Sequence, residues 1–199
     1  MAEISPRKQP RQARARATCE AVKQAAARIL VTGGPPALNT NAIAETAGVS
    51  VGTLYQYYPS KQAILAELVR DMRAGMLADI ERGRAQAKGH DLRTAVRLMV
   101  GASLHHHRRD ALGAEAMERA EAELPMDAET DALKRRIIAL VAELLAGYGI
   151  ADPELAARDL SAMTRGMAQA AVAAGETDFD ALTERIARGA IGYLETGCN

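Results

Sequence analysis

Apolar residues recur at helical spacing along almost the whole chain, and the alternating pattern typical of β-strands is missing. The pattern predicts helices over about 15–32, 40–47, 51–58, 60–83, 92–107, 111–122, 128–148, 153–174 and 180–194. Glycine and proline separate them, as at Gly33-Gly34-Pro35-Pro36 and at Gly149. The sequence therefore predicts an all-α fold of about nine helices, with a small N-terminal domain of three helices and a C-terminal helical bundle.

Residues 40–59 read as two short helices joined by a tight turn. Gly48 follows the first, where the chain must reverse with a positive φ that glycine adopts without strain. The small side chain of Ala44 permits a close helix crossing. The positions expected where the helices meet are Ile43, Ala47, Val49, Leu54 and Tyr57. This pattern is typical of a helix-turn-helix, whose second helix enters the major groove of DNA; an ordinary pair of packed helices is the alternative.

Residues expected to face outward around the second short helix suit contact with DNA. Thr53 and Gln56 can hydrogen-bond base edges, and Val51 can contact a thymine methyl group. Gly52 is unfavourable inside a helix but allows the backbone to approach DNA closely. The residues expected to reach phosphates are Thr40, Tyr55 and Lys61. We expect Tyr58, in contrast, to pack against the first helix.

The stretch IAETAGVSVGTLYQYYPSKQAIL, Ile43 to Leu65, resembles the N-terminal DNA-binding domain of the TetR family of bacterial transcriptional regulators, and the resemblance covers residues of about 15–66. Two departures are conservative: Tyr58 stands where Phe is usual, and Asn39 stands where Thr often begins the first short helix. The resemblance implies an operator-contacting set of Thr40, Asn41, Ser50, Val51, Gly52, Thr53, Tyr55, Gln56, Tyr57 and Lys61. It also implies a homodimer that binds a palindromic operator and is released by a small molecule.

Charge is distributed unevenly although the formal net charge is zero. Residues 1–70 carry a net charge of +5 and residues 71–199 one of −5, which suggests an anionic partner for the N-terminal part alone. Basic residues gather near the N-terminus at Arg7, Lys8, Arg11, Arg14 and Arg16. Because Pro6 and Pro10 disfavour a helix, we expect a disordered basic arm over 1–14, either a solvated tail or an arm along nucleic acid.

These observations divide the chain into three parts. The arm is followed by a helix-turn-helix DNA-binding domain over 15–60 and a ligand-binding and dimerisation domain over 61–199, with the fourth helix, about 60–83, as connector. We expect a ligand-responsive repressor whose partners are a double-stranded operator, an unidentified small-molecule effector and a second copy of the chain. The sign of regulation, the effector, the operator sequence and the regulated genes do not follow from the sequence.

Other classes of protein find less support. No run approaches 18 apolar residues and no secretory signal is visible, so we expect a cytoplasmic protein without a membrane span. Motifs of metalloproteases, phosphate-binding loops and serine hydrolases are missing, and no cofactor, metal or catalytic residue is predicted. A helical enzyme and a protein-binding adaptor remain as alternatives. Cys19 and Cys198 form no disulfide framework.

The C-terminal domain offers flexible apolar residues for a ligand pocket. Methionine adapts to irregular ligands, although such residues can equally be core filling. The pocket candidates are Met72, Met76, Met99, Met117, Ile137, Met163 and Met167.

The last two predicted helices carry long apolar stripes that suit a four-helix interface between two subunits. The interface candidates are Leu160, Met163, Met167, Ala170, Ala171, Ala174, Leu182, Ile186 and Tyr193. The alternative is that these faces cover only the subunit's own core.

Three histidines in a row, His105, His106 and His107, lie at the end of a predicted helix. Adjacent helical residues point about 100° apart, so the three cannot all face one metal ion. We expect them at the surface or at the rim of a pocket, where one could hydrogen-bond a ligand.

Overall fold

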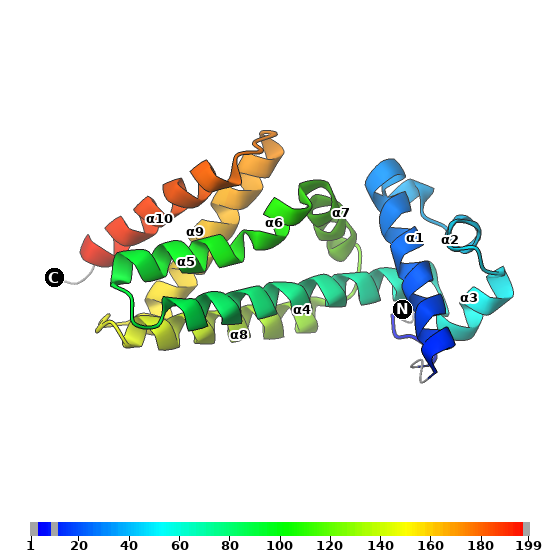
Figure 1. Cartoon of the computed structure of the whole chain (residues 1–199), viewed down its shortest axis with the longest axis horizontal. Helices are drawn as coiled ribbons and strands as arrows, with labels where there is room; N and C mark the ends of the chain where they lie inside the picture. The colour runs from blue at the N-terminus through cyan, green and yellow to red at the C-terminus, as the bar shows by residue number, and fades with distance from the viewer. Residues whose placement is uncertain (1–3, 9–11, 197–199) are drawn as a thin grey trace. The chain divides into compact units, whose positions relative to one another are not determined.

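The computed structural model describes residues 4–8 and 12–196, and every regular element in this part of the chain is a helix (Figure 1). The helices are α1 Ala13–Ala37, α2 Thr40–Ala47, α3 Val51–Tyr57, α4 Lys61–Ala87, α5 Leu92–Ser103, α6 His105–Arg109, α7 Ala111–Ala122, α8 Asp127–Ala146, α9 Pro153–Ala173 and α10 Phe179–Thr196. The predicted all-α class is confirmed. The described residues form ten helices where about nine were predicted, because α6 is separate from α5.

The glycine-proline run interrupts α1 at the place where the sequence predicts that the first helix stops. Gly34 leaves the helical region with φ 67° and ψ −177°, and one further turn then runs to Ala37. Glycine tolerates this positive φ, and the fixed φ of Pro35 suits the start of a helical turn. The helix is therefore kinked where the sequence predicts its end.

The chain divides into two compact units, the first made of residues 1–72 and 112–126. Its core combines α1, α2, α3 and the start of α4 around Val22, Ile43, Leu54 and Ile64, each at most 1% exposed. Ala116, Met117 and Ala120 of α7 belong to the same core. Thus α7, which lies within the predicted second domain, packs in the first unit. The division of the chain into a DNA-binding and a ligand-binding domain stays a prediction.

The second unit comprises residues 73–111 and 127–199. Here α10 packs against α5 and α9, and α9 packs against α8. Its larger core gathers residues such as Val100, Leu160, Leu182 and Ile186. None of the helices in the described ranges is long and apolar enough to cross a membrane.

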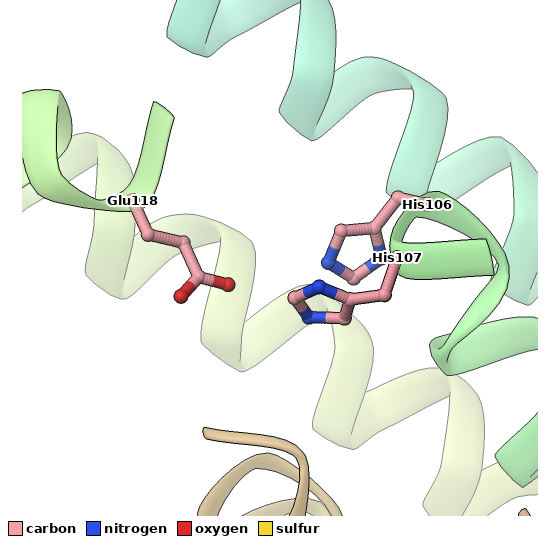
Figure 2. Close-up of side chains that lie close together, drawn as sticks. All are labelled: His106, His107 and Glu118. Atoms are coloured by element: carbon pink, nitrogen blue, oxygen red, sulfur yellow. The ribbon is translucent and has the colours of Figure 1, made fainter. Parts of the chain in front are cut away.

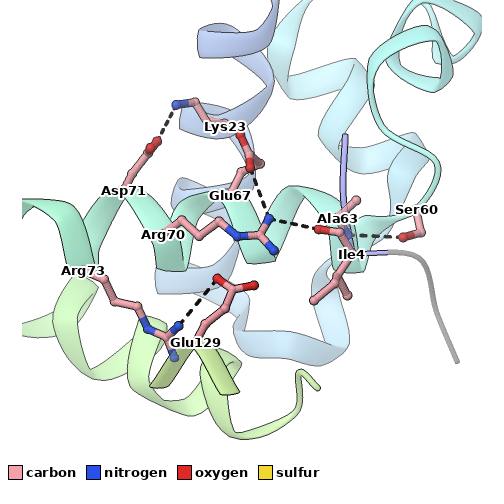
Figure 3. Close-up of polar contacts among 9 residues, drawn as sticks. All are labelled: Ile4, Lys23, Ser60, Ala63, Glu67, Arg70, Asp71, Arg73 and Glu129. Atoms are coloured by element: carbon pink, nitrogen blue, oxygen red, sulfur yellow. Dashed lines mark hydrogen bonds and ion pairs between the residues drawn. The ribbon is translucent and has the colours of Figure 1, made fainter. Parts of the chain in front are cut away.

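Polar contacts also join α4 to α8 within the second unit. Buried Arg73 of α4 donates a hydrogen bond to Thr130 and lies 3.9 Å from a carboxylate oxygen of Glu129 (Figure 3). Farther along α4, the hydroxyl of Tyr148 donates to the carbonyls of Ala87 at 3.1 Å and His90 at 2.9 Å. These bonds connect Tyr148, just after the end of α8, to the last residue of α4 and to the turn that follows it.

Candidate nucleic-acid interface

The turn between α2 and α3 forms as the sequence predicts. Gly48 has φ 67° and ψ 31°, and its N–H closes α2 on the carbonyl of Glu45 at 3.1 Å. The N–H of Val49 then donates to the carbonyl of Ala44 at 3.0 Å. At the start of α2 the side chain of Asn39 accepts from the N–H of Ala42 at 2.9 Å, which is the N-cap bond expected for Asn. Both ends of α2 are therefore fixed by residues next to it in the chain.

Ser50 caps the N-terminus of α3. Its Oγ accepts from the N–H of Thr53 at 3.0 Å and lies 2.8 Å from the hydroxyl of Thr53. Leu54, one turn along, is fully buried against the core of the first unit. The rotation of α3 about its own axis is thereby set, because one side is packed inward and the cap fixes its first turn.

All ten candidate contact residues retain exposed surface in the first unit. Val51 and Tyr55 are 36% and 39% exposed. The exposed candidates are Asn41, Ser50, Val51, Gly52, Tyr55 and Gln56, and the half-buried ones are Thr40, Thr53, Tyr57 and Lys61. The outward face of α3 therefore carries the residues that the sequence analysis assigns to DNA.

All three residues expected to reach phosphates are held by neighbouring groups. The hydroxyl of Thr40, at the start of α2, lies 3.2 Å from the phenolic oxygen of Tyr55. The ammonium group of Lys61 donates to the carbonyl of Leu38 at 3.0 Å and is half-buried. Since an ammonium group has three N–H donors, this bond orients Lys61 and leaves other donors for a phosphate.

Tyr58 packs inward, in agreement with the expectation from the sequence. It is 2% exposed and lies in the core with Cys19 of α1. Burial raises the pKa of the Tyr58 phenol, and its hydrogen bond with Cys19 raises it further. Burial likewise raises the pKa of the Cys19 thiol. Both groups are therefore neutral at physiological pH, which suits a packed core. Cys198 lies outside the described residues.

A hollow of about 370 Å³ opens between the N-terminal turn of α1 and the N-terminal half of α3. Its walls are formed by Gln12, Arg14, Ala15, Thr18, Gly48, Val49, Ser50, Thr53 and Tyr57. Arg14 falls in the stretch predicted to be a disordered basic arm, and Gln12 and Thr18 are not among the predicted contact residues. Arg14 and Thr18 lie four residues apart on one face of the helix that begins at Ala13, and this spacing is the signal that could have identified them. The polar surface around α3 therefore extends onto α1.

The pocket candidates do not form one cluster. Met117 and Met72 pack with the core of the first unit. Met99 and Ile137 pack with Ile80 in a small cluster of the second unit. Of the remaining three candidates, Met163 and Met167 border the larger core of that unit, and Met76 is half-buried on α4.

The interface candidates separate into two groups. Leu160, Ala171, Leu182 and Ile186 are at most 8% exposed and fill the core of the second unit. Surface remains on the others: Ala170 and Ala174 are exposed, and Met163, Met167 and Tyr193 are half-buried. Tyr193 of α10 also donates a hydrogen bond to Asp159 of α9 at 2.6 Å. A partner subunit could therefore contact only the second group.

Of the three histidines expected at the surface or at the rim of a pocket, His105 and His106 are half-buried, whereas His107 lies inside the second unit. The ring centroids of His106 and His107 lie 4.0 Å apart (Figure 2), and His107 stacks on Phe179 at 5.9 Å. His107 is only 4% exposed because α6 turns it into the second unit. Burial, together with the neighbouring His107, lowers the pKa of His106 to about 4, and burial also lowers that of His107.

An exposed short helix preceded by a glycine turn and packed on two further helices defines a helix-turn-helix domain. The family described as "Bacterial regulatory proteins, tetR family" matches residues 24–68, and "Tetracyclin repressor-like, C-terminal domain" matches residues 91–194. The chain belongs to the TetR family. No curated protein matches the chain significantly.

Solved structures of TetR-like regulators share the fold. A regulator from Rhodococcus sp. RHA1 is 23% identical, with 94% of this chain and 99% of that chain covered and a TM-score of 0.68. FadR, a fatty acid degradation regulator from Bacillus halodurans, is 18% identical, with coverage of 92% and 96% and a TM-score of 0.71. SmeT, the repressor of a Stenotrophomonas maltophilia multidrug efflux pump, is 20% identical, with coverage of 89% and 91% and a TM-score of 0.70; SmeT is also solved as a complex with triclosan.

Proposed function

We propose that the chain is a ligand-responsive transcriptional repressor that binds a palindromic operator as a homodimer. The observation that carries this proposal is the outward face of α3. Its polar and aromatic side chains are exposed, while Leu54 on the opposite side is fully buried. A helix held in this way can enter the major groove without unfolding the domain behind it.

The ten candidate contact residues would have different roles in binding. Thr53 and Gln56 would read base edges and Val51 a thymine methyl group. Thr40 and Tyr55, paired by their hydroxyls, would hold phosphates, as would Lys61. Contacts of this kind release counterions from DNA. The logarithm of the binding constant should therefore fall steeply and linearly with the logarithm of the salt concentration.

A second copy of the chain would bind through α9 and α10. Ala162, Gly166 and Ala170 are exposed at intervals of four residues on α9, and exposed Ala174 follows the end of that helix. Small residues on one helix face allow a close approach of the partner's helices. A two-fold dimer would present two copies of α3, and the operator would therefore be a palindrome.

Release would require a small molecule that binds better to a dimer whose α3 helices do not match the operator spacing. We place its site in the second unit, where Met76, Met99, Ile137, Met163 and Met167 offer adaptable apolar side chains. SmeT, which shares the fold, is solved with triclosan, and this supports a small-molecule effector as the class of ligand.

Selection of duplexes from a random DNA pool by the full chain tests the proposal. We expect enrichment of one palindromic sequence, bound by two chains. A protein-binding adaptor or an enzyme would enrich no sequence. Recovery of a non-palindromic site bound by one chain would contradict the dimer, and recovery of no sequence would contradict the proposed function as a whole.

A further inference from the structure

The segment Ile4–Lys8 lies against the helix-turn-helix of the first unit. The Ile4 side chain is half-buried and packs on the hydrophobic core. Its carbonyl accepts a hydrogen bond from the guanidinium of Arg70 on α4 at 3.1 Å (Figure 3). Arg70 is in turn held by Glu67 at 3.2 Å. A stretch that the sequence analysis assigns to a disordered arm is thus anchored at one end by apolar packing and by a charged donor.

Arg7 joins this segment to the end of α3. Its backbone N–H donates to the carbonyl of Tyr57 at 2.8 Å, and its guanidinium donates to the carbonyl of Tyr55 at 3.2 Å. Both carbonyls belong to the last turn of α3, where a helix has no internal donors left. The neighbouring carbonyl of Leu54 accepts from the N–H of Tyr58 at 2.9 Å. One residue therefore satisfies two of the terminal carbonyls of the short helix.

The charge of Arg7 suits this position as well as its hydrogen bonds do. The carbonyl end of a helix carries a partial negative charge, which a guanidinium stabilises. A helix of seven residues has few internal hydrogen bonds, so its geometry depends on what holds its ends. Ser50 holds the first turn of α3, and Arg7 holds the last.

We propose that Ile4–Arg7 form a strap that fixes the last turn of α3, and that Arg7 is a positioning residue for base readout. The proposal rests on the proposed function, because α3 must be the helix that reads DNA. The strap is made before DNA arrives, so α3 needs no ordering on binding. Its loss should weaken binding to the operator, which needs accurate side-chain positions, more than binding to unrelated DNA, which depends mainly on phosphate contacts.

An arm that only contributes positive charge would give a different result from a strap that positions α3. Variants of the two adjacent basic residues, Arg7 and Lys8, distinguish these two possibilities. Arg7→Ala and Lys8→Ala each remove one positive charge from exposed neighbouring positions. Affinity is measured for the palindromic duplex recovered by selection and for a scrambled duplex of the same composition, each at several salt concentrations. We expect Arg7→Ala to bind the palindrome about tenfold more weakly than Lys8→Ala does, equivalent to about 1.4 kcal/mol. The two variants should bind the scrambled duplex equally. If Arg7→Ala and Lys8→Ala lose affinity equally, on the palindrome as on the scrambled duplex, the strap is overturned.

A variant that changes no charge gives a second test of the strap. Ile4→Ser removes the apolar anchor, and we expect it to lower affinity for the palindrome while leaving the salt dependence as in the unmodified chain. Unchanged affinity for the palindrome would contradict an anchored strap.

Hydrogen exchange of the free, full-length protein tests the strap without DNA. We expect a protected amide at Arg7 and faster exchange of the Tyr58 amide in Arg7→Ala than in Lys8→Ala. An Arg7 amide that exchanges at the rate of an unfolded chain would overturn the strap even if DNA binding is confirmed. If the unmodified chain selects no DNA while these amides behave as expected, the strap stands and the proposed function fails.

Discussion

The hydroxyl of Thr40 lies 3.2 Å from the phenolic oxygen of Tyr55, which joins the first residue of α2 to the exposed face of α3. Fifteen residues separate them in the sequence. The contact between the two hydroxyl groups limits the positions that both side chains can take. In our proposal the pair forms one preorganised phosphate contact.

Tyr55→Phe should therefore reduce operator binding while leaving the fold unchanged. The variant keeps the ring and removes the group that contacts Thr40 and, in our proposal, a phosphate. We expect a roughly three- to tenfold loss of affinity, the size of one hydrogen bond. Stability should change little because Tyr55 is 39% exposed. Titration of a labelled operator and urea unfolding measure the two effects.

Tyr148→Phe is a control with the opposite pattern. Its hydroxyl bonds to the carbonyls of Ala87 and His90 in the second unit. Its loss should lower the free energy of unfolding by about 1 kcal/mol and leave operator affinity unchanged. Equal operator affinity for Tyr55→Phe and Tyr148→Phe would remove Tyr55 from the interface.

Much of the helix-turn-helix could be predicted because its determinants are local. The expected helices at 40–47 and 51–58 agree with Thr40–Ala47 and Val51–Tyr57 to within one residue. Asn39, Gly48 and Ser50, which fix their ends, lie directly beside them. A cap or a turn glycine acts on its immediate neighbours, so its effect can be read from a short stretch of sequence.

Contacts between distant segments could not be predicted in this way. Helical spacing shows that Met117 lies on an apolar face, but not that this face packs with the core of the first unit. Nothing near Arg7 in the sequence indicates a bond to a carbonyl 48 residues away. The separate helix α6 was missed because its five residues show no periodicity, and the burial of His107 was missed with it.

Gly52→Ala should stabilise the chain but weaken operator binding. A Cβ atom at Gly52 would meet only the Oγ of Ser50, at an ordinary 3.8 Å, so the fold itself does not require glycine there. Alanine should raise the free energy of unfolding by about 0.5–1 kcal/mol. If the backbone of α3 approaches DNA as closely as we propose, the added methyl group should lower operator affinity by about tenfold or more.

Two further glycines serve as controls for this variant. Gly75→Ala on α4, where a Cβ meets nothing within 4 Å, should give a similar gain in stability with unchanged operator affinity. Gly48 has φ 67°, so Gly48→Ala should instead lower stability by about 1–2 kcal/mol. Unaltered operator binding by Gly52→Ala would argue against close approach of this part of α3.

His106 should make stability depend on pH in mildly acidic solution. Its pKa is about 4 in the folded chain and about 6.5 in an unfolded one, so the unfolded state binds more protons between these values. Stability from this group is complete above about pH 6.5 and is lost as the pH falls toward 4. Between pH 7 and pH 5 we expect about 2 kcal/mol of loss from His106, and His107, whose pKa is lowered too, should add to it. Urea unfolding of the original chain and of His106→Gln at both values isolates this contribution, and equal losses in the two proteins would contradict it.

Ala170→Glu tests the proposed dimer surface on α9. Ala170 is exposed in the second unit, so a larger side chain there should not disturb the subunit's own core. In a two-fold interface the substitution would bury two carboxylates, one from each copy, without partners. We expect the dissociation constant of the dimer to rise on the order of 100-fold or more, with weaker binding to a palindromic operator. Ala85→Glu, at an exposed position of α4, adds the same charge and should leave the dimer intact. Sedimentation at micromolar concentration distinguishes the outcomes: two variants that both remain dimers would place the interface elsewhere, and a monomeric original chain would contradict the dimer itself.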